Sequence, residues 1–200
     1  CEQTAGCTGF TVKAGVCGKT SDVAHLQDEL TGALIGLARS TDGGTQATSD
    51  TWRLMMEGLF TTVTNVNFNE KTIRDLIDRV HEEKARLVPG CSDCGSRCGQ
   101  NDDYDMNLLW NAQEDIRSLK SLILFGIRGM AAYAYHAAVL GYKDEEIHRF
   151  LYKALFAVGM DDWGMDELLP IVLEVGEVNL KCMAMLDKAN PAAFGNHEPT

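Results

Sequence analysis

The sequence contains no apolar run of the roughly 18 to 20 residues that a membrane-spanning helix requires. Residues 1–6 lack the basic and apolar regions of a signal peptide. Basic residues are scarce, with 18 Lys and Arg against 29 Asp and Glu. The net charge of −11 repels nucleic-acid phosphates and anionic lipids. We therefore expect a soluble, cytoplasmic protein that binds neither nucleic acid nor a membrane.

Motifs for nucleotide binding and serine-hydrolase chemistry are also missing. The sequence has no GxGxxG, no P-loop and no GxSxG. The histidines show no i, i+3 or i+4 pair that could hold a metal. Acidic pairs such as Glu114-Asp115 are typical of solvated helix faces and helix N-termini. The cysteines are thus the main candidates for chemistry.

Helical spacing dominates the sequence, and no segment alternates with the period of a strand. After a possible cap at Thr20-Ser21-Asp22, apolar residues recur every three or four positions from Val23 to Leu37. The same spacing recurs along the chain, including one long pattern that starts near Asp105 and reaches Leu140. The predicted helices cover residues 21–39, about 50–63, 70–87, 105–140, 143–158 and 165–186.

Six amphipathic helices predict an all-α fold. Three helices lie on each side of a cysteine-bearing connection, which favours two three-helix bundles packed together, preceded by an irregular cysteine-rich N-terminal loop. A single mixed six-helix bundle is the alternative. The expected parts are the loop, a possible iron–sulfur site, at 1–19, the first bundle at 20–90, the connection at 91–103, and the second bundle with a C-terminal tail at 104–200.

Six of the seven cysteines lie in two glycine-rich clusters. Close-set thiols in loops are typical of zinc or iron–sulfur ligands in a reducing compartment. Each cluster supplies only three thiols. Reduced thiols, a structural zinc or a disulfide are alternatives, and the two clusters could also meet. The candidate ligands are Cys1, Cys7 and Cys17 in the first cluster and, as weaker candidates, Cys91, Cys94 and Cys98 in the second.

Several longer motifs resemble one family. The N-terminal segments are Cys1-Glu-Gln-Thr, Thr11-Val-Lys and Gly15-Val-Cys-Gly-Lys-Thr. Later segments include Asn101-Asp-Asp-Tyr-Asp-Met, Ser118-Leu-Lys-Ser-Leu-Ile-Leu-Phe-Gly-Ile-Arg-Gly-Met and Asn196-His-Glu-Pro-Thr. Together they resemble the first domain of the hybrid cluster proteins, also called hydroxylamine reductases or prismane proteins.

The resemblance implies an all-α first domain of two three-helix bundles in a cytoplasmic protein. In the family, an N-terminal cysteine quartet holds a 4Fe-4S or 2Fe-2S cluster that passes electrons to a hybrid 4Fe-2O-2S cluster. The hybrid cluster reduces hydroxylamine to ammonia and water, and nitric oxide to nitrous oxide. Its ligands belong to later domains, beyond the His-Glu-Pro-Thr segment that starts at His197.

The quartet is matched in part. By the resemblance, Cys1 corresponds to the second cysteine, so the first would precede residue 1, and Cys17 corresponds to the fourth. Phe10 stands where the third is expected, and Cys7 lies three residues earlier. Flexible glycines on both sides of Cys7 could let it act as a substitute ligand.

Two hypotheses follow. In the first, the chain is the N-terminal domain through which electrons enter a hydroxylamine reductase, and its partners are a redox protein or the remaining domains of the reductase. In the second, it is a cluster-free helical scaffold that binds a partner, with structural or zinc-bound thiols. The oligomeric state is not determined by the sequence.

Overall fold

The computed structural model describes residues 18–41, 47–87 and 102–196. These residues form helices and connections and include no β-strand, which confirms the all-α prediction. The helices are α1 (Ser21–Ser40), α2 (Ser49–Thr61), α3 (Glu70–Leu87), α4 (Met106–Trp110), α5 (Glu114–Val139), α6 (Glu145–Gly159) and α7 (Met165–Phe194).

Helix α1 is buried on most of its surface and packs against α2, α3, α4 and α6. The helix begins where the Thr20 hydroxyl accepts a hydrogen bond from the Val23 N–H at 3.3 Å, so a free donor of the first turn is satisfied. Leu30, Leu34 and Leu37 are fully buried. α1 therefore forms the centre against which the other early helices pack.

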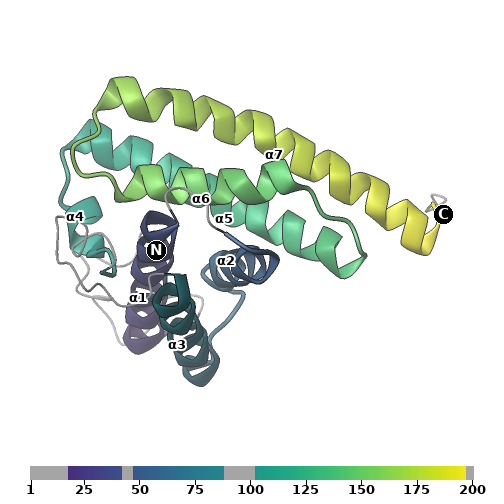
Figure 1. Ribbon diagram of the computed structural model, residues 1–200, viewed down its shortest axis with the longest axis horizontal. Coiled ribbons are helices and arrows are strands. Elements are labelled where there is room, and N and C mark those ends of the chain that lie inside the picture. The colour runs from purple at the N-terminus through teal and green to yellow at the C-terminus, as the bar shows by residue number, and fades with distance from the viewer. Residues whose placement is uncertain (1–17, 42–46, 88–101, 197–200) are drawn as a thin grey trace.

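The last three long helices, α5, α6 and α7, pack against one another and run alongside each other, while α1 and α3 lie across them (Figure 1). Helices α5 and α7 pack closely against each other. A Cβ placed on Gly126 would lie 2.5 Å from Val175 Cγ1, so only a glycine allows this approach. The Cys182 thiol lies 3.4 Å from the Met130 carbonyl oxygen, which marks a second point of contact between the two helices.

The two halves share one core. The buried apolar side chains form a single cluster with members from all seven described helices, and both α1 and α2 touch α6. The all-α class is confirmed, whereas the division into two three-helix bundles with boundaries at 90 and 104 stays a prediction.

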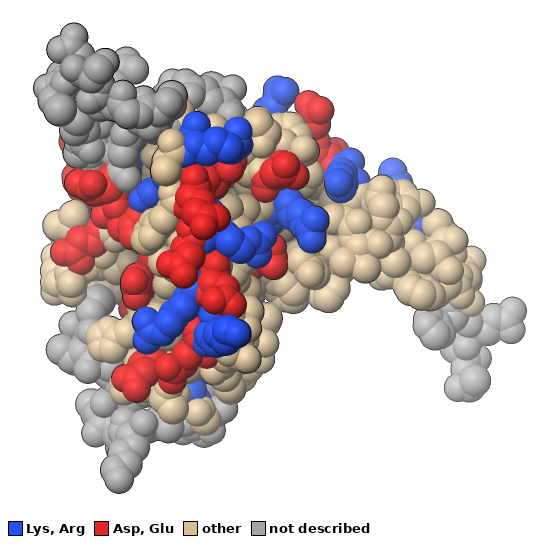
Figure 2. Space-filling view, turned by 60° about the horizontal axis from the view of Figure 1, so that its bottom comes forward, with Lys and Arg blue, Asp and Glu red and all other residues tan. Residues whose placement is uncertain are grey.

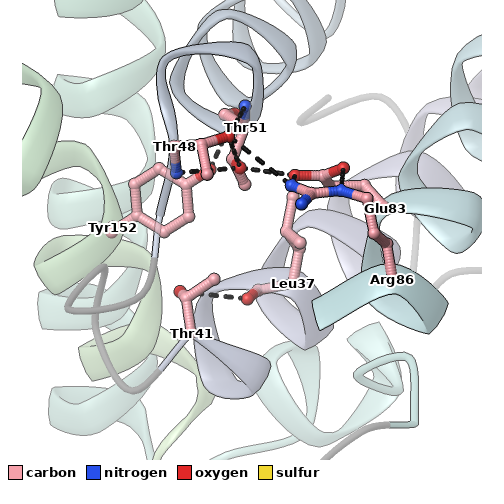
Figure 3. Close-up of polar contacts among 7 residues, drawn as sticks. All are labelled: Leu37, Thr41, Thr48, Thr51, Glu83, Arg86 and Tyr152. Carbon is pink, nitrogen blue, oxygen red and sulfur yellow. Dashed lines mark hydrogen bonds and ion pairs between the residues drawn. The ribbon is translucent and has the colours of Figure 1, made fainter. Parts of the chain in front are cut away.

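Polar contacts also connect α2, α3 and α6 (Figure 3). The Tyr152 hydroxyl donates a hydrogen bond to the Thr51 carbonyl oxygen at 2.7 Å, and the Thr51 hydroxyl donates one to the Glu83 carboxylate. Arg86 Nε donates to the other Glu83 oxygen at 2.8 Å. Hydrogen bonds from Arg86 hold the pKa of Glu83 below its usual range. This group joins helices that are distant in sequence.

The prediction of one long helix from Asp105 to Leu140 is wrong in its first third. The chain forms the short helix α4, leaves helical geometry at residues 111–113, and begins α5 at Glu114. The side chain of Gln113 accepts a hydrogen bond from the Ile116 N–H at 3.3 Å and caps α5. Polar side chains that bond to nearby backbone favour such breaks, which apolar periodicity does not reveal.

α7 is longer than the predicted 165–186, because it continues through Pro191 to Phe194. By length and hydropathy alone, α5 could cross a membrane, and 39% of that segment is buried. Core helices pass the same test, and α5 carries Lys120 and Arg128 while packing on α2, α6 and α7. The packing accounts for its apolar composition.

Candidate functional site

The six clustered cysteines lie outside the described residues: Cys1, Cys7 and Cys17 precede Gly18, and Cys91, Cys94 and Cys98 fall between 87 and 102. Their roles stay predictions. In the described ranges, no group of three or more His, Cys, Asp or Glu side chains could hold a metal. The structure does show how the chain is held immediately after each cysteine cluster.

The first attachment follows Cys17 directly. Gly18 has φ +86°, a backbone conformation that side chains disfavour. Lys19 is buried, and its ammonium donates a hydrogen bond to Gln27 Oε1 at 2.5 Å. Gln27 in turn donates to the Asn67 carbonyl oxygen at 3.0 Å. The chain is thus fixed at its entrance to α1.

Lys19 follows Cys17 by two residues, so their Cα atoms are no more than about 7.6 Å apart. The ammonium also lies 5.9 Å from the centre of the Phe68 ring. A nearby cation favours thiolate over thiol, and thiolate is the form that binds metal. Lys19 therefore supplies a buried positive charge at the start of the described chain, two residues after Cys17.

The second attachment follows Cys98. The Tyr104 N–H donates a hydrogen bond to the Gly32 carbonyl oxygen at 3.0 Å. A Cβ on Gly32 would lie 2.4 Å from the Tyr104 carbonyl oxygen, and one on Gly36 would lie 2.8 Å from the Asp102 carbonyl oxygen. Two glycines one turn apart on α1 therefore let residues 102–104 cross the helix at backbone contact.

Side chains reinforce this crossing. The Asp103 carboxylate pairs with His81 Nε2 at 2.8 Å and with the Lys84 ammonium on α3. The Tyr104 hydroxyl donates to Asp161 Oδ1 at 3.1 Å, in the connection between α6 and α7. The segment after Cys98 is therefore held by α1, by α3 and by the second half of the molecule.

Both attachments belong to α1 but lie apart on it. The first lies at the N-terminal end of α1 and the second near its middle; at a rise of 1.5 Å per residue, the 11 positions from Ser21 to Gly32 correspond to about 17 Å. The convergence of the two cysteine clusters stays untested, since both clusters lie outside the described residues.

Two further cations lie on α5, of which Lys120 is buried and Arg128 is half-buried. Arg128 donates a hydrogen bond to the Thr31 hydroxyl at 2.8 Å, and burial lowers its pKa to about 10. The Lys120 ammonium donates to the Met160 carbonyl oxygen at 2.8 Å, and burial lowers its pKa. Sequence analysis did not single out these residues or Lys19. The signal was available, because Arg128 and Lys120 interrupt an apolar helix and Lys19 follows a cysteine motif.

A separate cavity of about 570 Å³ lies between α2, α5 and α6. The rings of Trp52 and His148 pack at its wall with centroids 5.3 Å apart. Burial lowers the pKa of His148, which favours the neutral ring. Its lining mixes Arg53 and Lys143 with acidic groups, so it shows no preference for ligand charge.

The remaining cysteine, Cys182, is buried in α7. Burial raises the pKa of its thiol to about 11. A protonated thiol in the core is a packing group and a weak donor. Cys182 is therefore the natural control for the clustered cysteines.

Comparison with known proteins assigns the chain to a family. The model of the family described as Prismane/CO dehydrogenase matches residues 1–200. Among similar curated proteins, hydroxylamine reductase of Clostridium novyi (strain NT) is 38% identical over 221 residues, covering 100% of this chain and 40% of the relative. The one from Thermoanaerobacter pseudethanolicus is 39% identical with the same coverage, and the one from Acetivibrio thermocellus is 40% identical and covered over 39% of its length.

The chain thus spans about two fifths of the length of the curated relatives it matches. The family match covers all of the chain, including both cysteine clusters and the segments attached to α1. This chain belongs to the Prismane/CO dehydrogenase family.

Proposed function

We propose that the chain is the N-terminal domain through which electrons enter a hydroxylamine reductase of the hybrid cluster type. The observation that carries the proposal is the family match over residues 1–200 together with relatives named hydroxylamine reductase. The buried Lys19 beside Cys17 supports it, because a cation near thiolates suits an iron–sulfur site. The proposal places the protein in the cytoplasm with a redox protein as electron donor.

Cys1, Cys7 and Cys17 would hold a 4Fe-4S or 2Fe-2S cluster, with the second cysteine group as a weaker candidate site. Such a cluster supplies one-electron transfer when bound. Soft thiolates are the usual ligands of iron–sulfur clusters, and these cysteines supply three of the four ligands that such a cluster takes. Gly18, with φ +86°, and the buried Lys19 follow Cys17 directly and would fix the chain where it leaves the cluster.

Reduction itself is assigned to the later part of the protein. Hydroxylamine, two electrons and two protons give ammonia and water as the N–O bond breaks. Two nitric oxide molecules with two electrons and two protons give nitrous oxide and water. By the family resemblance, the hybrid-cluster ligands that would carry these reactions are not among these 200 residues. The chain's own part is electron transfer.

The test is the iron and acid-labile sulfide content of the chain purified without oxygen. We expect about four of each per chain for a cubane cluster. Cys17→Ser should reduce both contents severely, whereas Cys182→Ala should leave them unchanged because that thiol lies in the core. Iron and sulfide near zero in the unaltered chain would contradict the proposal and favour the cluster-free scaffold.

A further inference from the structure

The cavity between α2, α5 and α6 has features that electron transfer does not require. Its volume of about 570 Å³ lies within the range of small-molecule sites, roughly 300–1,000 Å³. The apolar part of its lining includes Trp52, Met56, Tyr135 and Ala138, which are buried or half-buried. The charged residues of the lining are exposed. The cavity therefore has an apolar interior and a charged rim.

Two buried nitrogen atoms in residues of the cavity wall lack hydrogen-bond partners. Among the residues that the structure describes, neither Trp52 Nε1 nor His148 Nδ1 has one. His148 is only 7% exposed, and its ring lies 5.3 Å from the Trp52 ring without a hydrogen bond between the two. An indole N–H can only donate, and a buried donor without an acceptor is unfavourable. The pair thus lacks an acceptor, which an oxygen atom of a ligand would supply.

The rim of the cavity carries charges of both signs. Asp50 and Arg53 belong to α2, and Lys143 and Glu145 lie where the chain enters α6. Glu145 pairs with Arg149 at 3.3 Å. In the described ranges, the other three rim residues form no ion pair. One acid and two cations therefore remain to meet a ligand.

Mixed charge of this kind selects for a particular class of ligand. On the face drawn in Figure 2, acidic and basic side chains are intermixed rather than separated into fields of one sign. The cavity rim has the same mixed character, so an ion of one sign meets a like charge as well as an opposite one. A zwitterion meets an opposite charge at each of its ends. The rim therefore favours a ligand that carries both signs.

We propose that this cavity binds a free α-amino acid with an apolar side chain. The carboxylate accepts a hydrogen bond from Trp52 Nε1 and is attracted by Arg53 and Lys143. The ammonium is attracted by Asp50, and the side chain packs on the apolar interior. Because Trp52 Nε1 is buried, binding must turn the half-buried Trp52 ring, so this residue reports on the ligand.

Indole N–H signals in proton–nitrogen NMR spectra of the chain test this inference. The probe is L-leucine, and its matched analogues are 4-methylpentanoate, which lacks the ammonium, and 3-methylbutylamine, which lacks the carboxylate. We expect leucine to shift the Trp52 signal saturably, with a Kd of about 1 mM, and each analogue to bind about tenfold more weakly. Trp52→Phe identifies the signal by its loss. Trp110 and Trp163 lie outside the cavity lining and serve as internal controls.

Substitutions at exposed rim positions separate the two charges without disturbing the core. Asp50→Asn should weaken leucine binding about fivefold and leave 4-methylpentanoate binding unchanged, because only leucine has an ammonium. Arg53→Gln should weaken the binding of both, since both carry the carboxylate. Arg79→Gln, at an exposed position on α3, is the matched control and should change neither.

No saturable shift of the Trp52 signal, or 4-methylpentanoate binding as tight as that of leucine, would overturn the proposal. Equal leucine affinity of the Asp50→Asn variant and the unaltered chain would overturn it as well. Shifts of the same size at all three tryptophans would show non-specific association and have the same consequence. None of these readouts involves iron, so the outcome is independent of cluster binding.

Discussion

Gly32 and Gly36 show how much a single missing Cβ matters in this protein. They allow residues 102–104, which follow the second cysteine cluster, to lie directly on α1. Neither glycine has a turn to form, since both lie inside a helix where glycine is usually unfavourable. Close approach of backbone is the physical reason for their presence.

Gly32→Ala should therefore destabilise the fold. The new Cβ would lie 2.4 Å from the Tyr104 carbonyl oxygen, and forced repacking of this kind costs about 1–3 kcal/mol. Gly129→Ala is the control, because its Cβ would meet nothing within 4 Å and alanine favours a helix by about 1 kcal/mol. Urea unfolding compares them. Equal midpoints for the two variants would contradict the close approach.

Buried cations are the residues that sequence analysis missed. Lys19, Lys120 and Arg128 each have a hydrogen-bond acceptor supplied by a distant part of the chain or by another turn. A lone basic residue in an apolar pattern is equally compatible with a solvated position. Only the tertiary arrangement shows that Lys19 and Lys120 are buried and that Arg128 is half-buried.

At the scale of elements, α3 is joined to α2 through one carboxylate. Glu83 accepts hydrogen bonds from Arg86 on its own helix and from Thr51 on α2. The spacing of Glu83 and Arg86 on one helix is visible in the sequence, whereas the contact with Thr51 is not. These hydrogen bonds are stronger while the carboxylate is charged, so their contribution to stability depends on pH.

Glu83→Gln should lower the free energy of unfolding by about 1 kcal/mol at pH 7. The folded-state pKa of Glu83 is depressed, so its contribution is present above the unfolded pKa of about 4.3 and is lost as pH falls through the folded value. The difference between variant and parent should therefore vanish in acid. Thermal unfolding between pH 3 and 7 measures it.

Glu82→Gln serves as the control for that series. Glu82 is exposed on the same helix, so its substitution should leave the free energy of unfolding within about 0.5 kcal/mol of the parent. A Glu83→Gln defect that persists unchanged at pH 3 would show that the carboxylate charge is not its source.

The break between α4 and α5 shows that a helix boundary can be missed by periodicity. Apolar spacing is nearly continuous from Met106 to Met130, so it predicted one helix. The side chain of Gln113 instead caps a new helix at Glu114. The spacing of apolar residues predicts that a helix forms, but where the helix begins or ends depends on a few local hydrogen bonds.

For the whole molecule, the continuous core has a consequence for unfolding. Side chains from all seven described helices share it, and Tyr152 bonds Thr51 across the two halves. Two independent bundles would instead have two cores. The extent of cooperativity thus tests the predicted division of the chain.

We expect one unfolding transition in which far-UV circular dichroism and tryptophan fluorescence coincide. Tyr152→Phe should shift both probes together and lower stability by about 1–2 kcal/mol, since the Thr51 carbonyl oxygen loses its donor. Tyr133→Phe, at an exposed position, is the control and should shift neither. Two separated transitions would contradict a shared core and support independent bundles.

The sequence by itself determined the helical class, the position of most helices, the two cysteine clusters and the family. These properties are local: apolar spacing, capping residues and short motifs are read within a few turns of chain. The tertiary structure alone decided that α1 is central and that the two halves share a core. Such properties depend on contacts between distant residues, which no local pattern encodes.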